Sequence, residues 1–208
     1  MPGALDRIAA AAVPLAALTA WQGLFDHGGL QAGQRVLIHA GAGGVGHFAV
    51  QFAKAKGAHV ITTVSTDDVA FAHSLGADEV VDHTKERFET KLRDIDLVYD
   101  LVGDETQEHS WAVLKKGGTL VTTLAEPSQD KANAIGVRAL RCTAQSNAAQ
   151  LREIDALIQA GKVRPLVSRK FAYGDAKEAL RGLEQGHGAG KLVLDMATSI
   201  ADFPEPLQ

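Results

Sequence analysis

The sequence has little cysteine and neither a strongly charged nor a long apolar segment. It contains one cysteine, Cys142, in 208 residues, so neither an internal disulfide nor a thiolate zinc site can form. The formal net charge of −4 and the lack of a basic cluster exclude the electrostatic footprint of a nucleic-acid-binding protein. No run approaches the roughly 20 apolar residues of a membrane-spanning helix. We therefore expect a cytoplasmic protein that binds neither nucleic acid nor membrane.

The apolar segment near the N-terminus has some features of a secretory signal. Arg7 precedes "IAAAAVPLAALTA", but Asp6 lies in the region that would be positive, and Pro14 interrupts the apolar run. After Pro14, apolar residues recur at three- and four-residue steps, which predicts one helix face packed on a core: Leu15, Leu18, Trp21 and Phe25. We expect this helix to end at residues 28–29, "GG".

Apolar, β-branched segments alternate with amphipathic ones along most of the chain. The predicted strands cover residues 34–40, 59–65, 79–83, 95–102, 119–125 and 137–145. One predicted helix ends at Gly57 and carries an apolar stripe formed by Val45, Phe48, Ala49, Phe52 and Ala53. Further helices are predicted at residues 67–75, after Asp104 and after Asn147. This alternation favours an α/β fold, a doubly wound parallel sheet of the Rossmann type with helices on both faces.

The helix after the fourth predicted strand has the clearest end signals. Asp104 and Gln107 have the spacing of a capping box, in which the two residues satisfy amides of the first turn. Trp111 and Leu114 would form its buried face. Residues 115–118, "KKGG", would form a basic last turn followed by a stop.

The alternation changes at residue 163, where "VRPLVSRKF" is extended and is followed by a short helix and a strand at 191–196. We therefore divide the chain into a nucleotide-binding domain at residues 1–162, with 1–13 as its lead-in, a C-terminal segment at 163–197, and a flexible tail at 198–208.

A glycine-rich loop follows the first predicted strand and opens a helix. Gly41-x-Gly43-x-x-Gly46 has the dinucleotide-binding spacing: the first glycine permits a tight turn, the second lets a pyrophosphate approach the backbone, and the third lets helix and strand pack closely. The amides and positive end of the helix would face the phosphates. A tight packing turn without a ligand is the alternative. The predicted phosphate loop comprises Gly41, Ala42, Gly43, Gly44, Val45 and Gly46.

The end of the second strand separates NAD from NADP sites. An NAD site places an acidic residue there, roughly 20 residues after the glycine loop. This chain has Ser65 and Thr66, which leave room for a 2′-phosphate, while Asp67 and Asp68 come one or two residues later. We expect NADP(H) in preference to NAD(H). The alternative is that the two hydroxyls cap the following helix, and both roles can coexist.

No residue is identified as a general acid or base. His83, after the third strand, could reach the adenosine end or be a solvated loop residue. Asp96 and Asp100 share one face of a strand and could act as paired carboxylates, although strand-end aspartates more often cap the next loop. Structural or exposed positions are expected for His39, His47 and His73.

Five segments together resemble the zinc-independent quinone oxidoreductase branch of the medium-chain dehydrogenase/reductase superfamily. They are "AAVPLAALTAWQGL", "AGQRVLIHAGAGGVGHFAVQFAKAKGAHVI", "LGADEVVDH", "DLVYDLVG" and "GKLVLDM", in the expected order. The resemblance runs from about residue 10 to residue 197. It implies a Rossmann domain joined to a GroES-like catalytic domain, and transfer of a hydride from NADPH to a quinone or an activated alkene.

The resemblance also implies positions for the cofactor. Thr19 matches a threonine that approaches the nicotinamide. The pyrophosphate loop and the 2′-phosphate region of relatives are matched by Gly43, Gly44, Val45, Ser65 and Thr66. Strand ends beside the cofactor are matched by Leu101, Val102 and Leu124. His83 stands where relatives often have a tyrosine near the adenosine. Leu15 replaces the cysteine that zinc-dependent relatives place four residues before the threonine, so no catalytic zinc is expected.

The resemblance further implies that most of a GroES-like domain is missing ahead of residue 10. Residues 163–197 would complete that domain, and a homodimer through residues 137–145 is plausible. The first hypothesis is thus the NADP(H)-binding portion of a quinone oxidoreductase-like enzyme, weakly active or inactive alone. The alternative is a non-catalytic NADPH-binding module or sensor that acts through a partner chain. A methyltransferase that binds S-adenosylmethionine is a third reading, and Ser65 argues against it.

Overall fold

A six-stranded parallel sheet forms the centre of the protein. The structure is a computed structural model that describes residues 5–184 and 188–198. The strands are β1 (Arg35–His39), β2 (His59–Val64), β3 (Glu79–Asp82), β4 (Ile95–Asp100), β5 (Leu114–Thr122) and β6 (Arg138–Arg141). Their order in the sheet is β3-β2-β1-β4-β5-β6, and every neighbouring pair is parallel. This order is that of the Rossmann fold, which confirms the predicted fold class.

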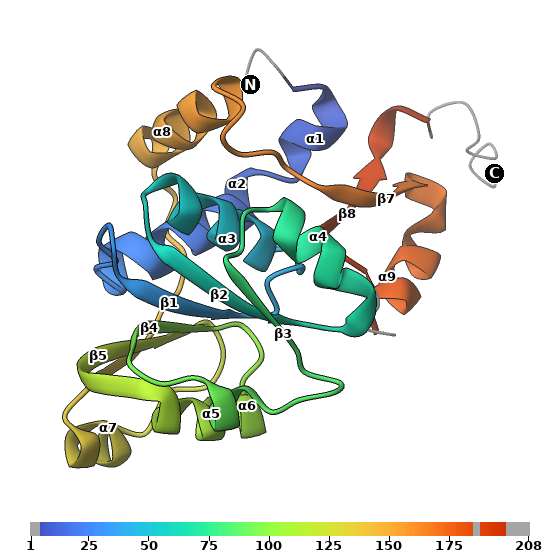
Figure 1. The fold of residues 1–208 in the computed structure, drawn as a ribbon. Helices are drawn as coiled ribbons and strands as arrows, with labels where there is room; N and C mark the ends of the chain where they lie inside the picture. The colour runs from blue at the N-terminus through green and yellow to red at the C-terminus, as the bar shows by residue number, and fades with distance from the viewer. Residues whose placement is uncertain (1–4, 185–187, 199–208) are drawn as a thin grey trace.

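Helices cover both faces of this sheet (Figure 1). One face carries α2 (Pro14–Trp21), α3 (Gly46–Ala55) and α4 (Val69–Ser74), with α8 (Ala148–Gln159) packed on α2. The other carries α5 (Phe88–Lys91), α6 (Asp104–Ser110) and α7 (Gln129–Ile135). The short helix α1 (Arg7–Ala11) directly precedes α2 in the chain. No helix among the described residues has the length and apolar character needed to cross a membrane.

Alternating side chains of the strands build a separate core on each side of the sheet. On β1, Ile38 points into the cluster that contains Phe48 and Phe52 of α3, whereas Leu37 points into the cluster that contains Phe88 of α5. Both sides of β1 are fully buried. The predicted apolar run of this strand therefore reflects burial on two faces, as in other parallel sheets.

The first predicted helix differs from its expected apolar face at one position. Leu18 and Trp21 are buried as expected, but Leu15 is 71% exposed. Small side chains take the core-facing positions instead, at Ala16, Ala17 and Ala20. The helix then changes to π-helical winding over Gln22–His27 before residues 28–29 end it, so a single 3.6-residue period could not describe the whole segment.

The predicted end of the helix after β4 is wrong. Strand β5 begins at Leu114, so residues 115–118 belong to the strand and not to a helix terminus. The capping box is also absent: Gly103 is the N-cap of α6, and the Gln107 side chain donates to the carboxylate of Asp100 at 3.1 Å. A buried acceptor in β4 thus binds the residue that the spacing assigned to the helix cap.

The C-terminal segment forms a second, smaller unit beside α3 and α4 (Figure 1). Strand β7 (Val167–Ala172) pairs in parallel with β8 (Lys191–Asp195), and α9 (Ala176–Glu184) lies between them in sequence. Arg7 of α1 makes a bidentate ion pair with Asp195, at 2.9 and 3.1 Å, so the lead-in of the chain is tied to β8. Almost all of the predicted flexible tail, residues 198–208, lies outside the described residues.

Candidate nucleotide-binding site

The glycine loop joins β1 to α3 at the point where the sheet order reverses, since β1 lies between β2 and β4. A Cβ on Gly46 would lie 2.0 Å from the carbonyl oxygen of Ala40, so only glycine lets α3 approach the strand this closely. A Cβ on Gly41 would lie 1.9 Å from Oγ1 of Thr62 on β2. The left-handed residue of the turn is Ala40, with φ of 54°, and not Gly41 as the motif predicts. Glycine at position 41 is therefore required by the close contact with Thr62 of β2.

The middle of the loop leaves polar backbone groups available for a ligand. A Cβ on Gly43 would meet only the carbonyl oxygen of Ala40, at 3.2 Å, so nothing in the described protein forces glycine there. The amides of Gly44 and Val45 donate no hydrogen bond within residues 5–184 and 188–198. These amides lie just before the N-terminus of α3, whose dipole favours an anion. The loop therefore fits a pyrophosphate.

The hydroxyls expected at the adenosine end are both bonded to carboxylates. Ser65 Oγ donates to Asp68 at 2.9 Å, and Thr66 Oγ1 donates to Asp82 at 2.6 Å. Neither hydroxyl caps the turn at Thr66–Asp68. The hydrogen bonds from Thr66 and Thr84 hold the pKa of Asp82 well below its usual range. This end of the site is therefore more acidic than the sequence pattern suggested.

His83 lies beside this region, at the end of β3. Its backbone amide donates to the carbonyl of Val64, at the end of β2, over 3.0 Å. Its side chain is exposed, and no side-chain hydrogen bond of His83 occurs within the described part of the chain. It is thus placed near Ser65.

Thr19, which the resemblance places near the nicotinamide, is held by β4. Its hydroxyl donates to the carbonyl of Leu15 at 2.7 Å, and its own carbonyl accepts from the Tyr99 hydroxyl at 2.7 Å. Burial raises the pKa of Tyr99 strongly. A Cβ on Gly23 would lie 2.3 Å from Cζ of Tyr99, so this glycine makes room for the ring. The π-helical turn, Gly23 and Tyr99 together fix Thr19 relative to β4.

Three apolar residues follow the ends of β4 and β5. Leu101 is half-buried, and the exposed fractions of Val102 and Leu124 are 44% and 41%. Leu124 packs against Gly103, where a Cβ would lie 2.9 Å from its Cδ1. The ends of β4 and β5 therefore present an apolar surface at the carboxyl edge of the sheet.

The two aspartates of β4 have separate structural partners. Asp100 is fully buried and accepts from the amides of Val102 and Gly103 at 3.0 and 2.9 Å, so it caps the loop. Asp96 accepts from the amide of Arg35 at 2.9 Å and pairs with Lys115. They do not form a carboxylate pair for acid–base chemistry.

Two histidines near the site are buried, and burial lowers the pKa of each to about 4. His39 lies 3.0 Å from Thr63 Oγ1 and 3.0 Å from Ser110 Oγ. His47 lies between the glycine loop and Leu166, at 2.9 Å from the Gly43 carbonyl and 3.1 Å from the Leu166 amide. Both side chains have structural contacts, as expected, while His73 of α4 is exposed.

The C-terminal segment forms part of the site, which local sequence patterns did not indicate. The Gly190 amide donates to the carbonyl of Ala42 at 2.8 Å, and a Cβ on Gly44 would lie 2.8 Å from Cδ of Lys191. A cavity of about 290 Å³ lies between loop and segment, lined in part by Gly44 and Lys191. The quoted motif "GKLVLDM" contains this lysine, but its spacing does not show which loop it meets.

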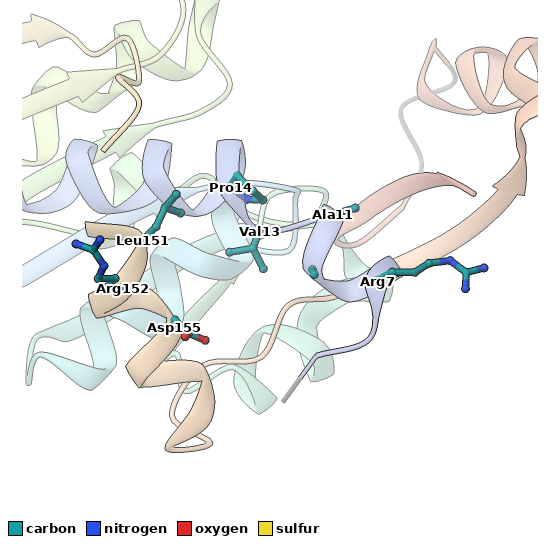
Figure 2. A pocket seen from close by; sticks show the side chains of 8 residues that line it. Arg7, Ala11, Val13, Pro14, Leu151, Arg152 and Asp155 are labelled. Atoms are coloured by element: carbon teal, nitrogen blue, oxygen red, sulfur yellow. The ribbon is translucent and has the colours of Figure 1, made fainter. Parts of the chain in front are cut away.

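A second cavity, of about 490 Å³, lies away from this site, between α1, the start of α2 and α8. Figure 2 shows Arg7 and Arg152 extending from its two sides, with Val13 and Leu151 between them. It contains no residue of the glycine loop, so it is distinct from the nucleotide site.

Known proteins resemble this chain in sequence and in fold. The profile of the zinc-binding dehydrogenase family matches residues 75–194, more than half of the chain. The chain belongs to this family. It is part of the medium-chain dehydrogenase/reductase superfamily. In the described part of this chain, no three histidine, cysteine or acidic side chains come together as metal ligands.

Two of the similar proteins are named as oxidoreductases, and a third is known in complex with NADPH. NAD(P)H oxidoreductase RTN4IP1 of Danio rerio is 34% identical over 94% of this chain and 58% of its own length. The quinone oxidoreductase of Coxiella burnetii is 38% identical, with a TM-score of 0.85 over 91% of this chain and 61% of that protein. A mycobacterial protein solved in complex with NADPH is 29% identical, with a TM-score of 0.85 over 93% of this chain and 66% of that one. The chain thus spans less than two thirds of these relatives.

Proposed function

We propose that the chain is the NADP(H)-binding portion of an enzyme that transfers a hydride from NADPH to a quinone or an activated alkene. The observation that carries this proposal is the glycine loop at the sheet reversal, where the amides of Gly44 and Val45, just before α3, donate no hydrogen bond within the described residues. The oxidoreductase relatives support the reaction class.

In this proposal each end of the site has a defined task. When bound, NADPH supplies the hydride, so the protein needs to bind, orient and exclude water. The glycine loop binds the pyrophosphate. Thr19, fixed by the 2.7 Å bond from Tyr99, orients the nicotinamide, while Leu101, Val102 and Leu124 exclude water beside it. Leu15 at the position of the zinc-binding cysteine supports transfer without zinc.

The preference for NADP(H) rests on Ser65 and is opposed by Asp68, whose carboxylate lies 2.9 Å from the Ser65 hydroxyl. We expect D68N, which retains an acceptor for Ser65, to bind NADPH about fivefold more tightly, because removing a nearby charge relieves about 1 kcal/mol of repulsion in water. NADH affinity should change little. The measurement is calorimetric titration with each cofactor.

D67N is the matched control, since Asp67 is exposed and precedes this carboxylate by one residue. It should alter neither affinity by as much as D68N does. Tighter binding of NADH than NADPH by the wild-type chain, together with weaker NADH binding by D68N, would instead assign Asp68 to the ribose hydroxyls of NAD.

Exposed apolar side chains of the C-terminal segment support a substrate domain that packs on it. Two leucines of α9 and the methionine after β8 are exposed, with fractions of 61% for Leu180, 60% for Leu183 and 57% for Met196. A helix that presents leucines to solvent is typical of an unfilled interface. In the proposal, residues 163–197 complete a GroES-like domain that supplies the acceptor site.

The test compares quinone-dependent oxidation of NADPH by the 208-residue chain with that of a version carrying an added upstream GroES-like domain. The proposal predicts NADPH binding by both and rapid turnover only by the longer version. Equal turnover by the short chain would show that its substrate site is complete. NADPH binding by both without turnover by either would favour the non-catalytic module.

A homodimer is also part of the proposal. Strand β6 (Arg138–Arg141) pairs with β5 alone among the described strands, so its second edge is available for another copy. Sedimentation should give twice the chain mass of 21.9 kDa, and a monomer at micromolar concentration would contradict this part.

A further inference from the structure

Two side chains of α3 bind the backbone of the C-terminal segment where it returns to the site. Gln51 donates to the carbonyl of Arg164 at 3.1 Å and accepts from the amide of the same residue at 2.9 Å. Four residues earlier on the same helix face, His47 accepts from the amide of Leu166 at 3.1 Å. The helix thus holds residues 164–166 through main-chain groups, whatever their side chains.

The same imidazole also holds the glycine loop. His47 Nδ1 lies 2.9 Å from the carbonyl of Gly43, and a carbonyl can only accept, so Nδ1 carries the proton and Nε2 accepts from Leu166. The ring is fully buried and its pKa is lowered to about 4, so this neutral tautomer is the form present at pH 7. One side chain therefore connects the phosphate loop to the C-terminal segment, 119 residues away along the sequence.

From Leu166 the connection continues to Lys191. The Leu166 carbonyl accepts from the Lys191 amide at 2.9 Å, and Gly190 donates to Ala42 in the glycine loop at 2.8 Å. A Cβ on Gly44 would lie 3.6 Å from Nζ of Lys191, so the lysine ammonium lies next to the glycine loop. No carboxylate pairs with this ammonium within the part of the chain that the structure describes, and it borders the cavity of about 290 Å³.

We propose that His47 is a positioning residue that docks the C-terminal segment on the glycine loop and thereby places the Lys191 ammonium against the cofactor pyrophosphate. This inference rests on the proposed function, because it assigns the anion to the dinucleotide. A purely packing role of His47 is the competing explanation. A purely packing role predicts that apolar or amide side chains of similar size at position 47 change the stability of the protein but not its affinity for NADPH.

Two variants of His47 separate the explanations. The amide of H47N can replace Nδ1 and donate to Gly43, but it is too short to reach Leu166. The amide of H47Q extends to the position of Nε2 and retains an acceptor for Leu166. We expect H47N and K191M each to weaken NADPH binding about tenfold, and H47Q, which keeps the acceptor for Leu166 but loses the donor to Gly43, to weaken it less than H47N does. K177M, on the exposed side of the same segment, is the matched charge control.

The double variant and hydrogen exchange complete the test. H47N/K191M should bind no more weakly than either single variant, since both act through one ammonium. Without any cofactor, H47N should speed exchange of the Leu166 and Lys191 amides, and H47Q should not. Unchanged exchange in H47N, or equal affinities of H47N, H47Q and the wild type, would overturn the inference while leaving NADPH binding intact. A wild-type chain that binds no NADPH would overturn the proposed function and with it the role of Lys191.

Discussion

Replacing Gly43 by alanine should abolish NADPH binding and leave the fold intact. A Cβ at this position would meet only the Ala40 carbonyl oxygen, at 3.2 Å, so a shift of a few tenths of an ångström accommodates it. In the complex, the same methyl group would occupy the space through which the pyrophosphate approaches the backbone. We expect the dissociation constant to rise at least a hundredfold, measured by calorimetry, with a thermal midpoint within about 2 °C of the wild type.

Two other glycines calibrate this result. G46A should lose both binding and stability, by about 3 kcal/mol or more, because its Cβ would lie 2.0 Å from the Ala40 carbonyl oxygen and 2.8 Å from Cα of Gly41. G174A should lose neither, since no atom lies within 4 Å of its Cβ. Normal NADPH binding by G43A would remove the phosphate role from the loop and leave only the tight packing turn.

The free energy of unfolding should fall steeply between pH 6.5 and pH 4. His39 and His47 have folded-state pKa values of about 4 against 6.5 in the unfolded chain, so in this range the unfolded state holds more protons. Above pH 6.5 both states are neutral at these positions, and nothing is lost. On acidification each histidine should cost about 3 kcal/mol, at about 1.4 kcal/mol per unit. Urea unfolding at pH 7 and pH 4.5 measures the difference.

The groups around His39 and His47 explain why the pKa of each imidazole stays low. Burial dominates for both; Asp100 and Glu89 oppose it at His39, while Lys191 adds to it at His47. Asp82, whose pKa is lowered by its hydrogen bonds, contributes mainly below about pH 4, at the acidic limit of this window. H47Q should remove about half of the slope. A stability that is flat between pH 7 and pH 4.5 would contradict the assignment of two buried neutral histidines.

Local sequence patterns predicted the parts of the fold that local physics determines. The unit β1, glycine loop, α3 and β2 was predicted because strand burial, the glycine positions and a 3.6-residue stripe all agree within 30 residues. The start of β5 was not predicted, because "KKGG" carries the signals of a helix end. Leu114 joins the sheet through its pairing with Ile95 of β4, which lies in another segment of the chain. The left-handed turn at Ala40 was missed because the motif assigns such freedom to glycine.

The sequence predicted residues at the strand ends of the candidate site, but not the contacts between the glycine loop and the C-terminal segment. Strand-end residues of a parallel sheet converge on one edge, so Ser65 and His83 could be placed from their positions in the alternation, whereas Leu101 was placed by the family resemblance. The partners of Ser65 could not be placed, since hydrogen bonding to Asp68 depends on side-chain orientation. The His47–Leu166 and Lys191–Gly44 contacts join distant segments and leave no local periodicity to read.

The most direct test of the central claim is calorimetric titration of the wild-type chain with NADPH, NADH and S-adenosylmethionine, with G43A beside it. The glycine loop is proposed to bind a dinucleotide through its free amides, so one saturable NADPH site per chain is predicted, with weaker NADH binding, no S-adenosylmethionine binding and no NADPH signal in G43A. Absence of NADPH binding by the folded wild-type chain, or binding of S-adenosylmethionine in its place, would contradict it.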